Sequence, residues 1–110
     1  MSFLAIDAQK NLFTLQKSQL QFEQTLIMSR VNHIVKEIGY YEQDFEASNP
    51  DGDIQNDAYF QELQATEQYL ETRQDSLDTQ ISVLDNEISS MKNLVNNNIK
   101  STCALNLIGS

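Results

Sequence analysis

The sequence predicts an all-α protein built as one long antiparallel hairpin of two helices, a coiled coil that oligomerisation completes. Three observations lead to this class: two segments with a seven-residue repeat of apolar side chains, a turn sequence between them, and few residues that break helices. Proline occurs once, at Pro50, and the three glycines are Gly39, Gly52 and Gly109. A heptad repeat of apolar positions is typical of helices that pack along their length.

The first helix is predicted from about residue 7 to residue 46. Its apolar positions form one heptad series, which a second series joins toward the turn: Phe13, Leu20, Ile27, Ile34 and Tyr41, with Val31, Ile38 and Phe45. Gly39 inside this helix costs about 1 kcal/mol relative to alanine and marks either a kink or a close helix contact, of which we favour the contact.

The turn is predicted over residues 47–55. Pro50 lacks a backbone donor and disfavours a helical conformation at Asn49, while Gly52 permits a positive φ. Aromatic side chains gather on both sides of the turn, and we interpret them as a small core that holds the hairpin closed. They are Tyr40, Tyr41, Phe45, Tyr59 and Phe60.

The second helix is predicted from about residue 56 to residue 100, with an apolar tail over 101–110. Its two heptad series are Leu63, Leu70, Leu77, Leu84 and Met91, and Phe60, Ile81, Ile88 and Val95. In the antiparallel register that we predict, facing residue numbers add to about 104. Polar positions then meet apolar ones: Gln74 and Glu67 face Val31 and Ile38, and Gln24 and Lys17 face Ile81 and Ile88. The seam is only partly apolar at these layers, so further helices would complete it.

Length and charge limit the possible functions. The 110 residues predict a single domain, 1–110, and the net charge of -9 without a basic stripe argues against nucleic-acid binding. No apolar run reaches the length of a membrane span, so we expect no membrane insertion as a monomer. The first residues lack a basic leader, which predicts a cytoplasmic protein or one exported without a cleavable signal peptide. Cys103 is interpreted as a buried or inert thiol, although a single cysteine also permits an intermolecular disulfide.

The turn contains the main candidate for metal chemistry. Asp51, Asp53, Asp57 and Glu62 fall at calcium-loop positions 1, 3, 7 and 12, but the sixth position is Asn56 where the template requires glycine. The favoured alternative is that Asp53, Asn56 or Asp57 caps the second helix. We therefore predict no metal and no cofactor.

Catalysis is not expected. His33 is the only histidine and is expected to be solvated, and one histidine with one distant cysteine cannot form a nucleophile, base and orienting acid. The sequence predicts a protein that is not an enzyme and has no catalytic residues.

Charged and apolar residues are unevenly placed. Between Glu42 and Asp78 there are eleven acidic residues and one basic residue, Arg73. In a hairpin the two termini meet at the end away from this acidic turn, and their apolar residues are the predicted interaction site. They are Phe3, Leu4, Ile6, Ile99, Leu105, Leu107 and Ile108.

The segments 47–51 and 58–63, followed by Tyr69, resemble the type III secretion needle subunit, with Asn49-Pro50 as the most recognisable element. The resemblance implies two helices around an Asn-Pro turn, with terminal segments that pack in a hollow filament. The segments 15–22 and 77–101 also resemble small uncharacterised bacterial helical proteins.

These expectations combine into two functional hypotheses. The first is a non-enzymatic bacterial structural subunit, secretion-related, that self-assembles through its heptad seams and apolar termini into a filament or other oligomer. The alternative is a cytoplasmic coiled-coil adaptor or chaperone that binds another helical protein. The predicted partner is therefore a second copy of the chain or another helical protein.

Overall fold

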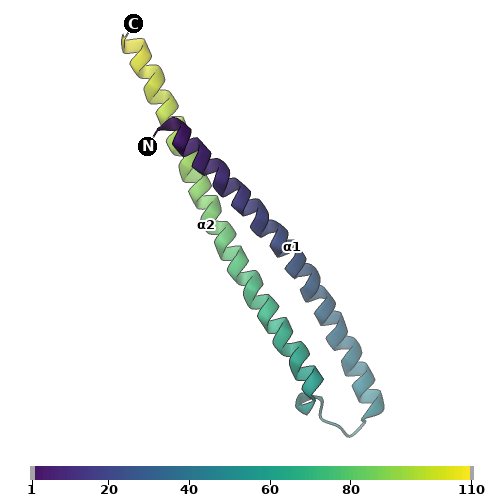
Figure 1. Cartoon of the computed structure of the whole chain (residues 1–110). Coiled ribbons are helices and arrows are strands. Elements are labelled where there is room, and N and C mark those ends of the chain that lie inside the picture. Colours follow the sequence, from purple (N-terminus) through teal and green to yellow (C-terminus); the bar gives the residue numbers. More distant parts are fainter. Residues whose placement is uncertain (1, 110) are drawn as a thin grey trace. The chain divides into compact units, whose positions relative to one another are not determined.

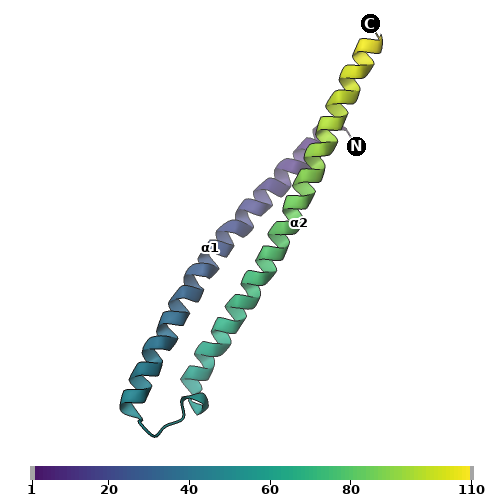
Figure 2. The same ribbon diagram turned by 180° about the vertical axis from the view of Figure 1, so that it is seen from behind.

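A computed structural model describes residues 2–109, without the side chains of residues 3, 102 and 104–109. It contains two long helices, α1 (Phe3–Ser48) and α2 (Ala58–Gly109), joined by a turn that holds the short 3₁₀ helix η1 (Ile54–Asn56). Figures 1 and 2 show this arrangement from two sides. The described chain has no strand. The predicted all-α helical hairpin is therefore confirmed.

α1 extends beyond the predicted range at both ends, and α2 extends beyond it at its C-terminal end, although α2 begins at Ala58 instead of about residue 56. α1 begins at Phe3 because Ser2 caps it: the Ser2 hydroxyl accepts a hydrogen bond from the Ala5 backbone N–H at 3.2 Å. α2 continues through Asn96, Asn97 and Asn98 to Gly109, where the sequence predicted a helix end near residue 100 and a separate tail. Asparagine lowers helix propensity by at most about 0.7 kcal/mol per residue, so three in a row need not end a helix that is anchored by the buried Val95.

The chain divides into two compact units, each made of a segment of both helices. Unit 1 consists of Met1–Gln21 and Thr79–Ser110, and unit 2 is Phe22–Asp78. Ile6, Ile88 and Val95 are the buried apolar side chains described in unit 1. Unit 2 buries Ile27, Phe60, Leu63, Leu70 and Leu77. Every apolar position of the predicted heptad series is buried or half-buried, which confirms the seam.

Polar seam positions bond to carboxylates on the facing helix. In unit 1 the Lys17 ammonium lies 2.5 Å from an Asp85 carboxylate oxygen. In unit 2 the Gln24 side-chain amide donates to Asp78. Asp85 lies three residues before Ile88, which the register places opposite Lys17, and Asp78 lies three residues before Ile81, which it places opposite Gln24. Each polar side chain therefore binds its carboxylate about one helical turn away from the apolar side chain that faces it.

The glycines have other roles than the sequence suggested. No described residue has a positive φ, so Gly52 is not required for a left-handed conformation. An added Cβ at Gly52 would lie 2.9 Å from Asn49 Cβ and 3.1 Å from the Phe45 ring, so glycine is needed for close packing of the turn. A Cβ at Gly39 would meet nothing within 4 Å. The favoured interpretation of Gly39 as a close helix contact is therefore wrong.

Candidate interaction surface

Unit 1 exposes large apolar side chains on both of its helices. On α1 these are Leu4, which is 75% exposed, Leu12 at 51% and Leu15 at 57%. On α2 they are Val83, Leu94 and Ile99. Exposed apolar surface on a small protein is characteristic of an interaction site. Unit 1 is therefore the first candidate for contact with another molecule.

The predicted interaction residues fall into three groups. Leu4 and Ile99 are exposed and available to a partner, whereas Ile6 is only 4% exposed and belongs to the core of unit 1. The others lie outside the described side chains: Phe3, Leu105, Leu107 and Ile108. The sequence reasoning missed Leu12 and Leu15. These leucines are three residues apart and lie outside the predicted seam, a pattern that could have shown a second apolar side of the first helix.

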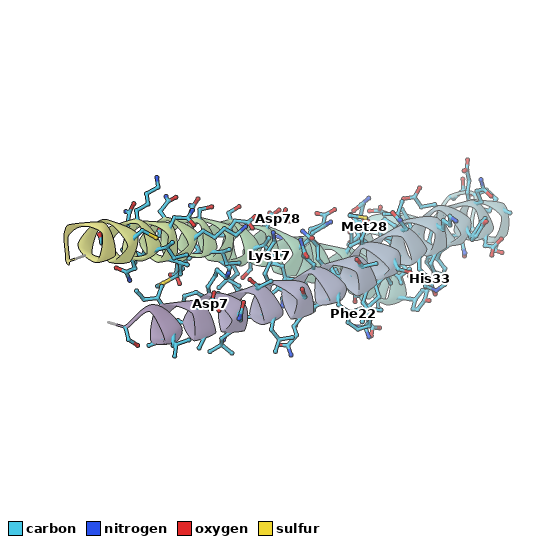
Figure 3. The ribbon with its side chains drawn as sticks, turned by 90° about the horizontal axis from the view of Figure 1, so that it is seen from above. Asp7, Lys17, Phe22, Met28, His33 and Asp78 are labelled. Atoms are coloured by element: carbon cyan, nitrogen blue, oxygen red, sulfur yellow. The ribbon has the colours of Figure 1, made fainter. Side chains whose placement is uncertain are left out.

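The charges of unit 1 are nearly balanced, and several of them are paired. The unit contains three acidic residues and four lysines. Asp7 and Lys10 form an ion pair at 3.1 Å on α1, and Lys17 pairs with Asp85 on α2. Figure 3 shows Lys17 on the side of α1 that faces α2. The cations of α1 in this unit are thus engaged and do not surround its exposed leucines.

Unit 2 has the opposite electrostatic character. Thirteen of the sixteen acidic residues but only three of the seven lysines and arginines belong to it. The Arg73 guanidinium binds the Glu23 carboxylate with Nε at 3.0 Å and Nη2 at 2.8 Å. Unit 2 also exposes apolar side chains, including Phe22, which lies on the outer edge of α1 in Figure 3, and Tyr69. Its excess negative charge opposes contact between two copies of this unit.

Hydrogen bonds between tyrosines and carboxylates hold the turn end of unit 2. The Tyr41 hydroxyl donates to Asp57 at 2.6 Å, and the Tyr59 hydroxyl donates to Glu37 at 2.5 Å. The hydrogen bond from Tyr41, with a second from the Phe60 backbone N–H, lowers the pKa of Asp57. The same bond to Asp57 raises the pKa of Tyr41, and the bond to Glu37 raises the pKa of Tyr59.

The aromatic core expected at the turn is confirmed in part. The ring centroids of Tyr41 and Tyr59 lie 4.8 Å apart with an edge-on arrangement, and those of Tyr41 and Phe45 lie 6.3 Å apart. Phe60 is buried. Tyr40, however, is 66% exposed and does not belong to this core. Tyr41 therefore joins the aromatic contacts to the cap of α2 through Asp57.

Two of the four candidate calcium ligands, Asp53 and Asp57, act as helix caps. Asp57 accepts a hydrogen bond from the Phe60 N–H at 2.9 Å and so caps α2, which confirms the favoured alternative. Asp53 caps η1, where it accepts from the Gln55 N–H and the Asn56 side-chain amide. Asp51 and Glu62 are exposed. Among residues 2–109, no three histidine, cysteine, aspartate or glutamate side chains form a group that could hold a metal ion.

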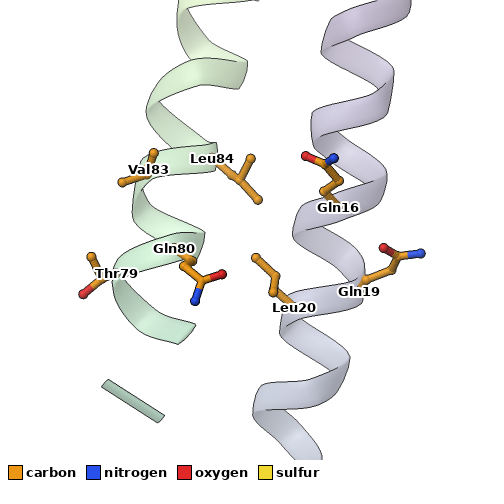
Figure 4. A pocket seen from close by; sticks show the side chains of 7 residues that line it. All are labelled: Gln16, Gln19, Leu20, Thr79, Gln80, Val83 and Leu84. Atoms are coloured by element: carbon orange, nitrogen blue, oxygen red, sulfur yellow. The ribbon is translucent and has the colours of Figure 1, made fainter. Parts of the chain in front are cut away.

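Unit 1 also contains a shallow groove between its two helices, with a volume of about 460 Å³. Its lining is uncharged and consists of Gln16, Gln19, Leu20, Thr79, Gln80, Val83 and Leu84. Figure 4 shows Leu20 and Leu84 pointing into the space between the helices. An apolar floor with glutamines at the rim suits side chains that project from a partner helix.

The two remaining residues of interest are both at the surface. His33 is solvated, as predicted, with its side chain 78% exposed and 3.8 Å from Glu37. Cys103 is a free, exposed thiol, so the interpretation of a buried cysteine is wrong. It lies on the helical continuation of α2, where the sequence predicted a tail after the helix.

Comparisons with known proteins found no relative of this chain. No protein family, characterised protein or solved structure matches the chain. Within the described residues, no helix is both long and apolar enough to cross a membrane. The class that the fold defines is an all-α two-helix hairpin, and its function is inferred from the surfaces described above.

Proposed function

We propose that this chain is a non-enzymatic structural subunit that self-assembles through its helix surfaces into a filament or another oligomer. The observation that supports this most is the contrast between the two units. Unit 1 combines exposed apolar side chains with nearly balanced charge, whereas unit 2 contains most of the acidic residues. Copies of an acidic protein would associate where the apolar gain is available and the repulsion is smallest.

The thin core gives a second reason to expect association. Only eight apolar side chains are buried in the described chain, and six of them come from α2. Among the described side chains of α1, only Ile6 and Ile27 are buried, while other seam positions such as Phe13 and Ile34 are half-buried. Contact with helices of other copies would remove more of this α1 surface from water and so stabilise the fold.

The filament form and a role in secretion rest on the resemblance of the turn to needle subunits. In that arrangement the apolar terminal segments pack inside the assembly, and the acidic turn lies at a solvated surface. This distribution is compatible with the exposed Leu4 and Ile99 in unit 1 and the acidic excess in unit 2. The proposal assigns no reaction, so it predicts assembly without turnover.

A second candidate is a coiled-coil adaptor or chaperone that binds another helical protein. The groove of unit 1 favours it, because an uncharged opening with Leu20 and Leu84 at its floor can accept apolar side chains of a foreign helix. An adaptor would form a small oligomer of fixed size, whereas a structural subunit would form larger species as its concentration rises.

Size-exclusion chromatography with light scattering over a wide concentration range distinguishes the two candidate functions. Negative-stain microscopy of the heaviest fraction then shows whether that fraction contains filaments. Growth into filaments or large oligomers with concentration supports the structural subunit. A dimer or tetramer of constant mass at every concentration favours the adaptor. A monomer throughout the range contradicts self-assembly.

A further inference from the structure

We propose that the outer face of α1 in unit 1 binds the same face of a second copy, in an antiparallel, two-fold symmetric contact. The outer face is defined as Ala5, Ala8, Leu12, Leu15 and Gln19, all of which are exposed. This inference rests on the proposed self-assembly and names its first contact. In a two-fold contact each copy contributes the same surface, so the face must be complementary to itself.

The spacing of the outer face is that of a second helix-packing seam. Its members follow one another at intervals of three, four, three and four residues, the spacing that keeps side chains in line along a helix. They lie roughly 120° around the helix from the seam that contains Ile6, Phe13 and Leu20. In unit 1, α1 therefore has two apolar sides. One side packs on α2, and the other has no partner among the described residues.

The outer face is free of charge over its whole length. The charged residues of α1 in unit 1 are Asp7, Lys10 and Lys17, and none of them belongs to the outer face. Asp7 and Lys10 pair with each other, and Lys17 pairs with Asp85 of α2. Two copies that each have a net charge of -9 therefore meet with little local repulsion on this face.

The α2 side of unit 1 is a poorer surface for a second copy. Between residues 79 and 100 it carries Asp85, Glu87, Lys92 and Lys100, and all four are exposed. Asp85 already pairs with Lys17, but removing the other three charges from water without partners is unfavourable, so a stable contact would have to match them. The outer face of α1 needs no matching of charge.

Side-chain size favours the antiparallel orientation. Antiparallel pairing can place Leu12 against Ala8 of the second copy and Leu15 against Ala5, so that each large side chain meets a small one. A parallel contact would set leucine against leucine and alanine against alanine, which leaves gaps at the alanine layers. Interiors pack best when large and small side chains alternate across the contact.

The first test adds charge to the outer face and to a matched control surface. Leu12→Glu with Leu15→Glu should weaken self-association, measured by sedimentation equilibrium, by at least about tenfold in Kd, equivalent to about 1.4 kcal/mol. Ser82→Glu with Asn86→Glu adds the same charge at two exposed positions of α2 in unit 1, and it should change Kd by less than about threefold. Far-UV circular dichroism checks that helicity is retained in both variants.

The second test is a cross-link that does not depend on weakening the protein. In a Cys103→Ser background, a mixture of the Ala8→Cys and Leu12→Cys proteins should form a mixed disulfide under mild oxidation, because facing Cα atoms lie within disulfide reach. The Ser82→Cys protein serves as the control and should remain uncross-linked. A parallel contact would instead cross-link Leu12→Cys with itself and would overturn the orientation.

The outcomes separate this inference from the proposed function. If the natural chain assembles but both glutamate pairs leave Kd unchanged, the outer face is not the contact, while self-assembly still stands. If the natural chain is monomeric at every concentration, the proposed function fails and this inference fails with it. Loss of assembly in the α1 variant alone, together with the mixed disulfide, supports the inference.

Discussion

Replacing Gly52 or Gly39 by alanine adds one Cβ methyl group in either case, but the structure predicts opposite effects on the free energy of unfolding. At Gly52 the new Cβ would lie 2.9 Å from Asn49 Cβ and 3.1 Å from two atoms of the Phe45 ring. At Gly39, inside α1, it would enter open space. Neither glycine has a positive φ, so alanine causes no backbone strain at either position.

The magnitudes follow from these surroundings. Overpacking of a well-packed site lowers the free energy of unfolding by about 1–3 kcal/mol. Alanine also reduces the conformational entropy of the unfolded chain, which raises the free energy of unfolding by about 0.4–1 kcal/mol. Gly52→Ala should therefore lower the free energy of unfolding by roughly 1–2 kcal/mol. Gly39→Ala should raise it by about 1 kcal/mol, because glycine inside a helix is disfavoured relative to alanine by that amount.

Thermal melts followed by far-UV circular dichroism measure both effects. A change of 1 kcal/mol shifts Tm by about 4 °C for a chain of this size. All variants must be compared at one protein concentration, since self-association makes Tm depend on concentration. A higher Tm for Gly52→Ala, or a lower one for Gly39→Ala, would refute the packing argument at that position.

Three further predictions concern the core, the turn and the ion pair between the helices. Leu77→Ala should cost about 2–5 kcal/mol in urea unfolding because Leu77 is fully buried, whereas Leu26→Ala, at a position 48% exposed, should cost less than about 1.5 kcal/mol. Because the pKa of Asp57 is lowered in the folded protein, the stability that Asp57 supplies is present above about pH 4 and is lost as the pH falls through the lowered pKa. The pKa of Tyr41 is raised, so the stability that Tyr41 supplies is present below about pH 10 and is lost as the pH rises through the raised pKa. Tyr41→Phe should make both losses smaller in melts recorded across pH. Arg73→Ala should cost about 0.5 kcal/mol at low salt and less in 1 M NaCl, because the pair is partly exposed.

Each of these predictions has an outcome that contradicts it. Equal costs for the two leucine variants would mean that the seam does not form the core. A pH profile unchanged by Tyr41→Phe would show that the hydrogen bond to Asp57 does not contribute. A cost for Arg73→Ala that is independent of salt would point to lost packing of its side chain instead of lost charge.

The fold class and the main elements follow from the amino-acid sequence alone. The heptad series identify which side of each helix is buried, because side chains three and four residues apart share one side of a helix. Every predicted seam position from Phe13 to Val95 is buried or half-buried. Asn49-Pro50 placed the turn, and the preference of aspartate for helix N-termini limited the cap of α2 to a few residues, among them Asp57.

The roles of the remaining residues became visible in the folded structure. It showed that Gly52 packs closely against Asn49 and the Phe45 ring and that Gly39 faces open space, a distinction that depends on how the turn brings these side chains together. It also showed that Lys17 turns toward Asp85, which leaves the other side of α1 without charge around Leu12 and Leu15. Periodicity reveals which side chains share one side of a helix, but which charge binds which partner depends on the distance between helices. That distance is set by packing, and therefore only the folded chain identifies the candidate interaction surface.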